Sequence, residues 1–418
     1  MKKSLLTKAS VLLLASAIGC QEKPVEADYT TMSDEERLEA AKEIAHETIM
    51  VDGHVDLPYR MKVGGFTLQR EILDVSERTD GGNFDFPRSK EGGLDAPFMS
   101  IYLPARYQEM GGAKNLADSL ILMTKRLADT WPEKFAMAYS PDDIEANFKA
   151  GKISLPMGME NGAGIEDNIE NVAYFHEKGI RYITLTHGKD NLIGDSSYDT
   201  ARTHGGLTEF GKEVVKEMNK VGIMVDISHV SDDTFYDVME LTDVPVIASH
   251  SSCRKYTPGF ERNMDDDMIK KLGEENGVIM INFGGSFIDG NYNDRTAEVR
   301  EHIVNWLAQN EFSRSDSAAQ AYIEKYTAEH NVFPDVKLVA DHIDHVVSIA
   351  GIDHVGFGSD FDGVGDSLPN GLKDVSMYPN LIAELLKRGY SKEDIEKICY
   401  KNVFRVWRAV EDAAKKTS

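Results

Sequence analysis

Short apolar runs rich in β-branched residues alternate along this chain with longer amphipathic stretches. The short runs cover residues 49–56, 98–104, 153–160, 181–187, 223–229, 245–250, 277–283 and 354–360. Runs of this length predict buried strands, and most are separated by segments with apolar residues at helical spacing. Helices are predicted at 113–131, 208–221, 231–241, 265–275 and 336–350. Another helix should begin after Ser33, whose hydroxyl can cap an acidic first turn, and reach about Thr48.

Eight strands with intervening helices favour a (β/α)8 TIM barrel of the α/β class. No glycine-rich nucleotide-binding fingerprint follows the first strand, which argues against an open, doubly wound sheet. Two segments exceed a minimal barrel. Residues 57–97 are predicted to form a long loop, and residues 284–335 form an insertion with helices at 295–310 and 315–330. Insertions at the carboxyl ends of strands lie over the active face of such a barrel.

The N-terminus has the pattern of a bacterial lipoprotein signal. Lysines near Met1 precede the short apolar run 11–15, and small residues then lead to Cys20. An apolar run this short is typical of a signal peptide and too short for a membrane span. We therefore expect a signal peptide at 1–19, lipid on Cys20, a tether at 20–33 and the catalytic barrel at 34–418. The alternative is an ordinary secretory signal in which the cysteine is incidental.

The chain has 418 residues and a formal net charge of −24. This acidity argues against nucleic acid or an anionic membrane surface as a partner, because both select basic patches. Its simplest interpretation is a well-solvated surface. The remaining cysteines, Cys253 and Cys399, do not make a disulfide framework and are read as incidental.

Ionisable residues mark the ends of the predicted strands. They are His54 and Asp56 after the first strand, then Glu160, His187, His229, His250 and Asp360 at later strand ends. Burying such groups in apolar runs is costly unless they are paired, and a barrel brings its strand ends to one mouth. Neutral imidazoles and carboxylates suit zinc, and a carboxylate can bridge two ions. The set therefore predicts a two-metal hydrolytic site.

Each of these residues also has a structural interpretation. A single histidine at a strand end is more often a hydrogen-bonded structural residue than a metal ligand. Asp360 could cap the following turn, and Glu160 could pair with a nearby lysine. The case for a metal site depends on the coincidence of all seven residues at equivalent strand ends.

Six motifs in order, "DGHVDLP", "GMENG", "YITLTH", "DISHVS", "IASHSS" and "GFGSDFDG", resemble the membrane dipeptidase (renal dipeptidase) family of zinc peptidases. The resemblance runs from about residue 46 to about residue 410 and implies a dipeptidase that tolerates a D-residue at the C-terminal position. It implies that one zinc is bound by His54 and Asp56, the other by His229 and His250, and that Glu160 bridges both.

The resemblance also assigns roles in the reaction. His187 would lie beside the scissile carbonyl, and Asp360 would lie near the substrate amine and relay a proton. Arg262 matches an arginine that holds the substrate carboxylate, although it could also be a solvated charge before a helix. A hydroxide bridging the two zinc ions would attack the peptide carbon. The sequence departs from the mammalian members in three ways. Their disulfide pattern is missing, the expected anchor is an N-terminal lipid in place of their C-terminal glycolipid, and the insertion at 284–335 is longer.

Two other functions stay open on the sequence alone. One is a related amidohydrolase acting on a cyclic amide, lactone or N-acyl amino acid. The other is a non-catalytic peptide-binding lipoprotein. The presence of every expected metal-ligand residue argues against it. We expect the protein in a bacterial cell envelope, in the periplasm or on the cell surface, held by its lipid, and a homodimer is left open.

The lipoprotein hypothesis predicts the behaviour of a Cys20→Ala variant. Without the thiol there is no site for the lipid, so the mature form should be absent from the detergent-extracted membrane fraction. Fractionation and immunoblotting of wild type and variant measure this. A variant that matures and partitions like wild type would show that Cys20 is incidental.

Overall fold

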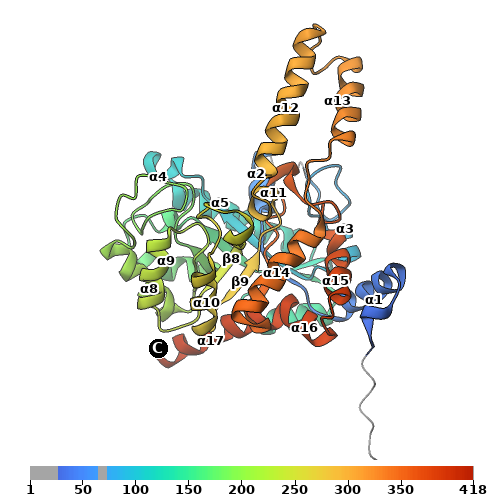
Figure 1. Ribbon diagram of the computed structural model, residues 1–418. Coiled ribbons are helices and arrows are strands. Elements are labelled where there is room, and N and C mark those ends of the chain that lie inside the picture. Colours follow the sequence, from blue (N-terminus) through green and yellow to red (C-terminus); the bar gives the residue numbers. More distant parts are fainter. Residues whose placement is uncertain (1–26, 65–72, 418) are drawn as a thin grey trace, which may run out of the picture.

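Eight parallel strands close into a barrel in the computed structural model, which describes residues 27–64 and 73–417 (Figure 1). In chain order they are β1 (Val51–Val55), β2 (Ala96–Tyr102), β5 (Met157–Glu160), β6 (Ile180–Thr184), β7 (Met224–Asp226), β8 (Ile247–Ser251), β9 (Val278–Ile281) and β10 (Val355–Phe357). Pairing of β10 with β1 completes the ring. The (β/α)8 barrel predicted from the sequence is confirmed.

One predicted strand is divided in two. Residues 153–160 form β4 (Ile153–Leu155) and β5, with Pro156 between them. β4 leaves the barrel and pairs with β3 (Phe135–Met137) in a two-stranded sheet. Proline has no N–H for a ladder, so a change of pairing partner is least costly at this residue.

The predicted helices are found within one residue of their expected ends. They are α5 (Ala113–Thr130), α8 (Glu209–Val221), α9 (Asp232–Leu241), α10 (Asp266–Glu274) and α14 (Val336–Ala350). α1 (Asp34–Glu47) begins with a capping box in which Ser33 and Glu36 satisfy each other's backbone N–H groups. Further helices are α6 (Pro141–Lys149), α7 (Glu170–Lys178), α15 (Tyr378–Lys387), α16 (Lys392–Glu396) and α17 (Asn402–Thr417).

Two N-terminal expectations need correction. The segment 57–97 is not one long loop, because it contains α2 (Leu57–Val63) and α3 (Phe86–Gly92), the latter capped by Asp85. The end of the expected tether is ordered against the domain. Arg37 donates hydrogen bonds to the carbonyls of Tyr29 and Met32. Cys20 and the predicted signal peptide lie outside the described residues.

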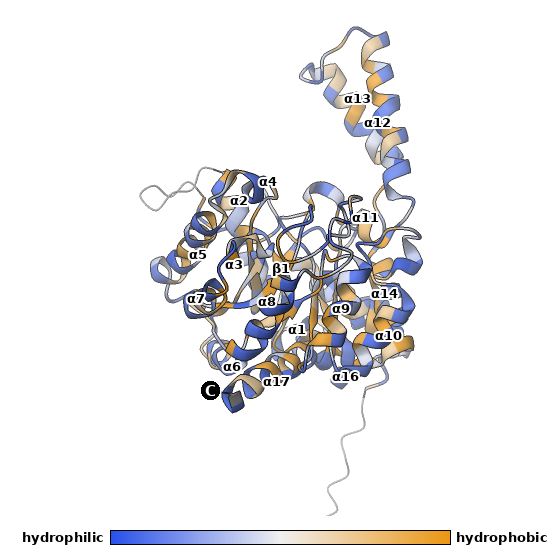
Figure 2. Ribbon diagram, turned by 90° about the vertical axis from the view of Figure 1, so that its left-hand side faces the viewer, coloured by the Kyte–Doolittle hydropathy of each residue, from blue (hydrophilic) through white to orange (hydrophobic). Residues whose placement is uncertain are grey.

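Helix α17 crosses the end of the barrel opposite the mouth (Figures 1 and 2). Its Trp407 is fully buried in a cluster with the first residues of several strands, among them Val51, Ala96 and Val278. This cluster closes the bottom of the barrel with apolar side chains. The polar groups are thereby concentrated at the other end.

The insertion forms α11 (Gly285–Ile288), α12 (Tyr292–Gln309) and α13 (Ser317–Glu329). α12 and α13 make a hairpin that rises away from the barrel (Figures 1 and 2) and has its own small apolar cluster, which includes Ile303 and Leu307. At its base, Arg295 donates hydrogen bonds to Asp289 and to the carbonyl of Val332.

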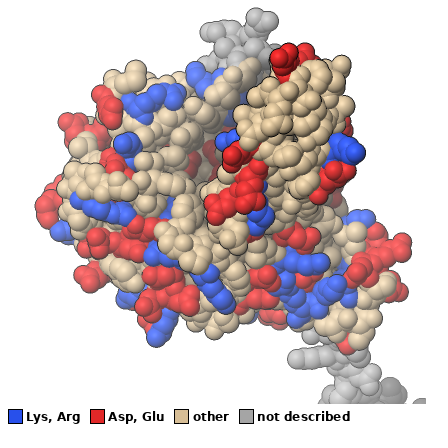
Figure 3. Space-filling model, turned by 45° about the horizontal axis from the view of Figure 1, so that its top comes forward, with Lys and Arg blue, Asp and Glu red and all other residues tan. Residues whose placement is uncertain are grey.

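The face from which the hairpin rises carries interspersed acidic and basic side chains (Figure 3), as expected for a solvated surface. A cavity of about 770 Å³ opens at the mouth. The insertion contributes four residues to its lining, namely Ser286, Phe287, Tyr292 and Asn293. Within the described ranges, no helix combines the length and apolar character that crossing a bilayer requires.

Excising the hairpin tests what the insertion does. The last residue of the insertion that lines the cavity is Asn293, and Arg295 donates a hydrogen bond to the carbonyl of Val332. A short glycine linker in place of 297–330 should therefore leave the cavity wall intact. Metal content and the order of preference among dipeptides should therefore be unchanged. Phe287→Ala is the matched variant that should shift this preference. A changed substrate panel in the excision variant would mean that the distal hairpin reaches the site.

Candidate metal centre

The seven predicted strand-end residues all reach the same end of the barrel. His54, Glu160 and His250 belong to β1, β5 and β8 themselves. The others lie in the loops that follow, because Asp56 comes one residue after β1, and His187, His229 and Asp360 come three residues after β6, β7 and β10. The expected convergence is confirmed. Strand alternation does not place Asp56, whose backbone has already left the extended conformation.

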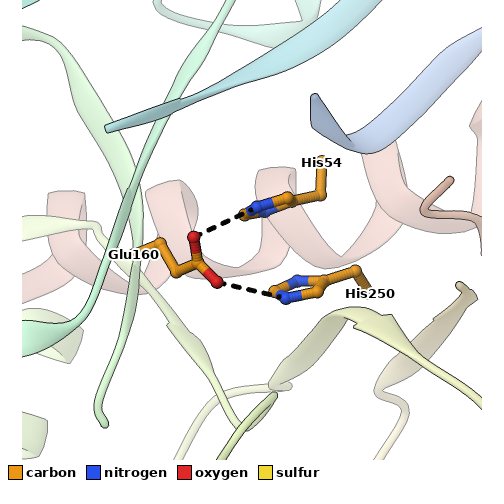
Figure 4. A group of neighbouring side chains, drawn as sticks. All are labelled: His54, Glu160 and His250. Carbon is orange, nitrogen blue, oxygen red and sulfur yellow. Dashed lines mark ion pairs between the residues drawn. The ribbon is translucent and has the colours of Figure 1, made fainter. Parts of the chain in front are cut away.

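Four imidazoles surround the carboxylate of Glu160. Its Oε1 lies 3.0 Å from Nε2 of His229, 3.4 Å from Nε2 of His250 and 3.5 Å from Nε2 of His187. Its Oε2 lies 3.4 Å from Nε2 of His54. His54 and His250 thus address different oxygens of one carboxylate (Figure 4). Glu160 stands between two groups of donors.

The contacts among these donors fit a bound cation. The Nε2 atoms of His229 and His250 are 2.9 Å apart, so two ring nitrogens face each other as well as Glu160. Nε2 of His54 is buried without a hydrogen-bond partner in the described chain, and Oδ2 of Asp56 is 3.5 Å away. Converging lone pairs of nitrogen and oxygen are the environment that zinc prefers.

Three groups of donors have ligand atoms within 4.8 Å of one another. They are His54, Glu160 and His250; Glu160, His187 and His229; and His54, Asp56 and Asp360. All share a member with another group, so the donors form one continuous centre. The residues therefore fit the presence of metal ions.

The backbone is strained at this centre. His229 and Asp360 have φ values of 68° and 63°, in the left-handed region that residues other than glycine rarely adopt. Each such residue costs on the order of 1–3 kcal/mol. A Cβ atom at Gly363 would lie 2.1 Å from Oδ1 of Asp360 and 2.2 Å from Oδ2 of Asp56. A glycine at this position is therefore needed to leave room for the two carboxylates.

The surroundings shift the pKa values of the buried histidines in opposite directions. Burial, together with the nearby Arg262, lowers the pKa of His229 and His250 well below the ordinary range. Burial opposes a charge on His54 too, but Tyr182, Glu160 and Asp56 outweigh it and raise its pKa well above that range. The surroundings of His54 therefore stabilise a positive charge, which is the condition for holding a cation.

The two carboxyl groups respond differently to burial. Burial alone would raise the pKa of Glu160, but the surrounding histidines, His54 and His187 foremost, hold it well below its ordinary range. Burial and the neighbouring Asp56 raise the pKa of Asp360 to about 7. Asn282 donates a hydrogen bond of 2.8 Å to Oδ2 of Asp360. Sequence reasoning missed this asparagine, which follows an apolar strand.

Arg262 is buried, with 3% of its surface exposed, so its interpretation as a solvated surface charge is wrong. Its two Nη atoms donate to the hydroxyl of Ser251 and the carbonyl of His250, both at 2.7 Å. Its Nε has no hydrogen-bond partner in the described chain, and its guanidinium lies 5.2 Å from the Phe287 ring centroid. Arg262 is thus a desolvated cation with a free donor behind the cavity wall.

Other residues of the site were not predicted. Tyr102 and Tyr198 line the cavity, and their rings lie near His187 and His229 respectively. Buried Asp52 accepts a hydrogen bond from the backbone N–H of His54, and buried Asp226 accepts one from the backbone N–H of Ser249. The available signal was the presence of acids inside the apolar runs "MVDGH" and "MVDIS".

The chain is similar to known dipeptidases over most of its length. The sequence profile of the membrane dipeptidase family, peptidase family M19, matches residues 38–418. The chain is 34% identical over 370 residues to "Dipeptidase tcpJ" of Claviceps purpurea, which covers 87% of this chain and 77% of that protein.

Two solved structures illustrate the shared fold. "Probable dipeptidase PvdM" from Pseudomonas aeruginosa matches with a TM-score of 0.75 at 23% identity, covering 91% of this chain and all of that one. A metallopeptidase from Rhodobacter sphaeroides, liganded with a phosphinate mimic of the dipeptide L-Ala-D-Ala, matches with a TM-score of 0.70 at 24% identity. That match covers 87% of this chain and 99% of the other.

Glu160→Gln tests the centre directly. The substitution keeps the volume of the side chain but removes the charge placed between the two groups of donors. We expect the loss of at least one metal ion per chain and of nearly all hydrolysis. Metal analysis of the purified variant, with circular dichroism to confirm folding, measures this. A full metal complement with ordinary turnover would contradict the central role of Glu160.

Proposed function

Since the chain belongs to the membrane dipeptidase family, peptidase family M19, and is a metal-dependent dipeptidase, we propose that it works with two zinc ions. The observation that carries this proposal is the position of Glu160. One of its oxygens faces His54, and the other faces His229 and His250. His54 and Asp56 would hold one ion, His229 and His250 the other, and Glu160 would bridge them.

When bound, the two ions would lower the pKa of a water molecule and polarise the scissile carbonyl. The chain's own residues complete the site. His187 contributes an Nε2 beside Glu160 and lines the cavity, where it can donate a hydrogen bond to the developing oxyanion. Asp360, which accepts a hydrogen bond from Asn282, also lines the cavity and can take up a proton and pass it to the leaving amine.

The proposed substrates are free dipeptides, including those with a D-residue at the C-terminal position. A cavity of about 770 Å³ is large enough for a dipeptide, and Arg262 offers a desolvated cation for its carboxylate. The dipeptide mimic bound to the Rhodobacter sphaeroides relative is consistent with this choice. We further propose a lipid anchor on Cys20 that holds the enzyme in a bacterial envelope, on the sequence pattern alone.

Metal analysis combined with a panel of dipeptides tests the proposed function. The purified protein should contain two zinc ions per chain and hydrolyse dipeptides with free termini, among them L-Ala-D-Ala. Cyclic amides, lactones and N-acyl amino acids form the control set. Preference for a member of that set would replace the dipeptidase proposal with a related amidohydrolase.

Arg262→Ala tests how the substrate carboxylate is held. Losing a charged hydrogen bond in a desolvated pocket costs about 1.5 to 3 kcal/mol, or roughly ten- to a hundred-fold in kcat/KM. The loss should fall mainly on KM, because the contact binds substrate and transition state alike. Amidating the C-terminus of the substrate should cost wild type a similar amount.

The decisive measurement compares both enzymes on both substrates. For Arg262→Ala, the free acid and the amide should become nearly equivalent, because the partner of the carboxylate is already gone. If the two losses simply add, Arg262 does not contact the carboxylate and another basic residue holds it.

A further inference from the structure

Two of the histidines at the centre have their second ring nitrogen on a hydroxyl group. Nδ1 of His54 lies 2.9 Å from Oη of Tyr182, and Nδ1 of His250 lies 2.7 Å from Oγ of Ser249. All four side chains are buried. A hydroxyl can donate one proton only, so its other partners decide whether it donates to the imidazole or accepts from it.

At Tyr182, a backbone carbonyl fixes the direction of the hydrogen bond between its hydroxyl and His54. Its hydroxyl lies 3.0 Å from the carbonyl oxygen of Gly53, which has no proton to give. If Tyr182 donated to His54 instead, two oxygen lone pairs would face each other in a buried site, which is costly. The Tyr182 proton therefore goes to Gly53. Its oxygen accepts from Nδ1–H of His54, and this leaves a lone pair on Nε2.

At Ser249, a buried carboxylate fixes the direction of the hydrogen bond between its hydroxyl and His250. The carboxylate of buried Asp226 accepts from the backbone N–H of Ser228 at 3.0 Å and from that of Ser249 at 2.8 Å through Oδ1. Its Oδ2 accepts from the hydroxyls of Thr184 and Ser249, the latter at 2.6 Å. The Ser249 proton is thus committed to Asp226, and Oγ accepts from Nδ1–H of His250.

We propose that Tyr182, and Asp226 acting through Ser249, are positioning residues that hold His54 and His250 as Nδ1–H tautomers with Nε2 directed at the metals. Each of the two proposed zinc ions then has one histidine ligand whose tautomer is set by a buried hydroxyl. His229 differs, because its Nδ1 is buried without a hydrogen-bond partner in the described residues. The consequence for metal binding rests on the proposed function, whereas the tautomers are a property of the chain.

Packing inside the barrel makes this arrangement possible. A Cβ atom at Gly158 on β5 would lie 1.9 Å from Cζ of Tyr182, so only glycine there lets the ring cross the barrel to β1. Thr184, Asp226 and Ser249 lie on the successive strands β6, β7 and β8. Neighbouring strands thus bring the carboxylate and both hydroxyls together.

Asp226→Asn is the most informative variant. It keeps the shape of the side chain but should reverse the direction of the hydrogen bonds from Asp226 through Ser249 to His250. The two backbone N–H groups require the amide oxygen on their side, so the amide N–H₂ group faces Ser249 and Thr184. Ser249 then accepts from the amide and donates to Nδ1 of His250. The proton of His250 moves to Nε2, where it blocks metal binding. Tyr182→Phe removes the acceptor from His54 and keeps the ring.

Thr184→Val is the matched control. It deletes the other hydroxyl that donates to the same oxygen of Asp226, but it leaves the Ser249 proton on Asp226 and so should not change which nitrogen of His250 is protonated. A merely structural role for Asp226 would make this variant behave like Asp226→Asn. Circular dichroism establishes that each variant is folded.

The first readout is ¹⁵N NMR of the purified full chain with ¹⁵N-labelled histidine, before zinc is added, with His250 assigned by its absence in His250→Gln. Wild type and Thr184→Val should show His250 protonated on Nδ1, and Asp226→Asn should show it on Nε2. The second readout is zinc affinity, measured by competition with a chromophoric chelator. Asp226→Asn and Tyr182→Phe should each bind zinc about 10- to 100-fold more weakly, and Thr184→Val should bind as wild type does.

An unchanged Nδ1–H tautomer and unchanged zinc affinity in Asp226→Asn would overturn the inference, as would an equal loss of affinity in Thr184→Val. The predicted tautomers in a wild-type protein that binds no zinc would support this inference and refute the proposed function instead.

Discussion

Glu160 places a carboxylate in a barrel mouth from which water is largely excluded, since only 4% of its surface is exposed. A buried charge is tolerated only with close partners of opposite charge or with several hydrogen bonds. Four imidazoles surround this carboxylate, and they come from β1, β8 and the loops after β6 and β7. A bound cation would supply the opposite charge. The closed barrel is the condition for this arrangement, because it delivers the ends of distant strands to one carboxylate.

The geometry of the centre is unfavourable in free energy, so the rest of the fold must stabilise it. Left-handed backbone at His229 and Asp360, and imidazole nitrogens crowded against one another, are unfavourable in themselves. The cluster around Trp407 at the opposite end of the barrel is built mainly from apolar side chains. An apolar lower half thus supports a polar upper half, in which buried Asp226 accepts hydrogen bonds from the backbone and the hydroxyl of Ser249, next to His250.

The insertion also has two parts with different contacts. Its first residues, including Phe287 and Tyr292, form part of the cavity wall. The helices that follow leave the barrel and pack mainly on each other (Figure 2). Only the first residues of the insertion therefore contact the cavity, and the length of the hairpin need not affect the site. The hairpin can extend without disturbing its base because it has its own apolar cluster.

The sequence by itself determined the barrel, the ends of its main helices and the set of ionisable strand-end residues that meet at the mouth. These follow from local signals, since periodicity predicts elements and an ionisable residue in an apolar run indicates a partner. Only the tertiary structure decided the break at Pro156, the helices within 57–97 and the direction of the hairpin, because those depend on packing between segments. It also decided the burial of Arg262, the contact of Tyr182 with His54 and the contact of Asp226 with Ser249. No spacing along the chain encodes a hydrogen bond between residues 128 positions apart, such as that of His54 with Tyr182.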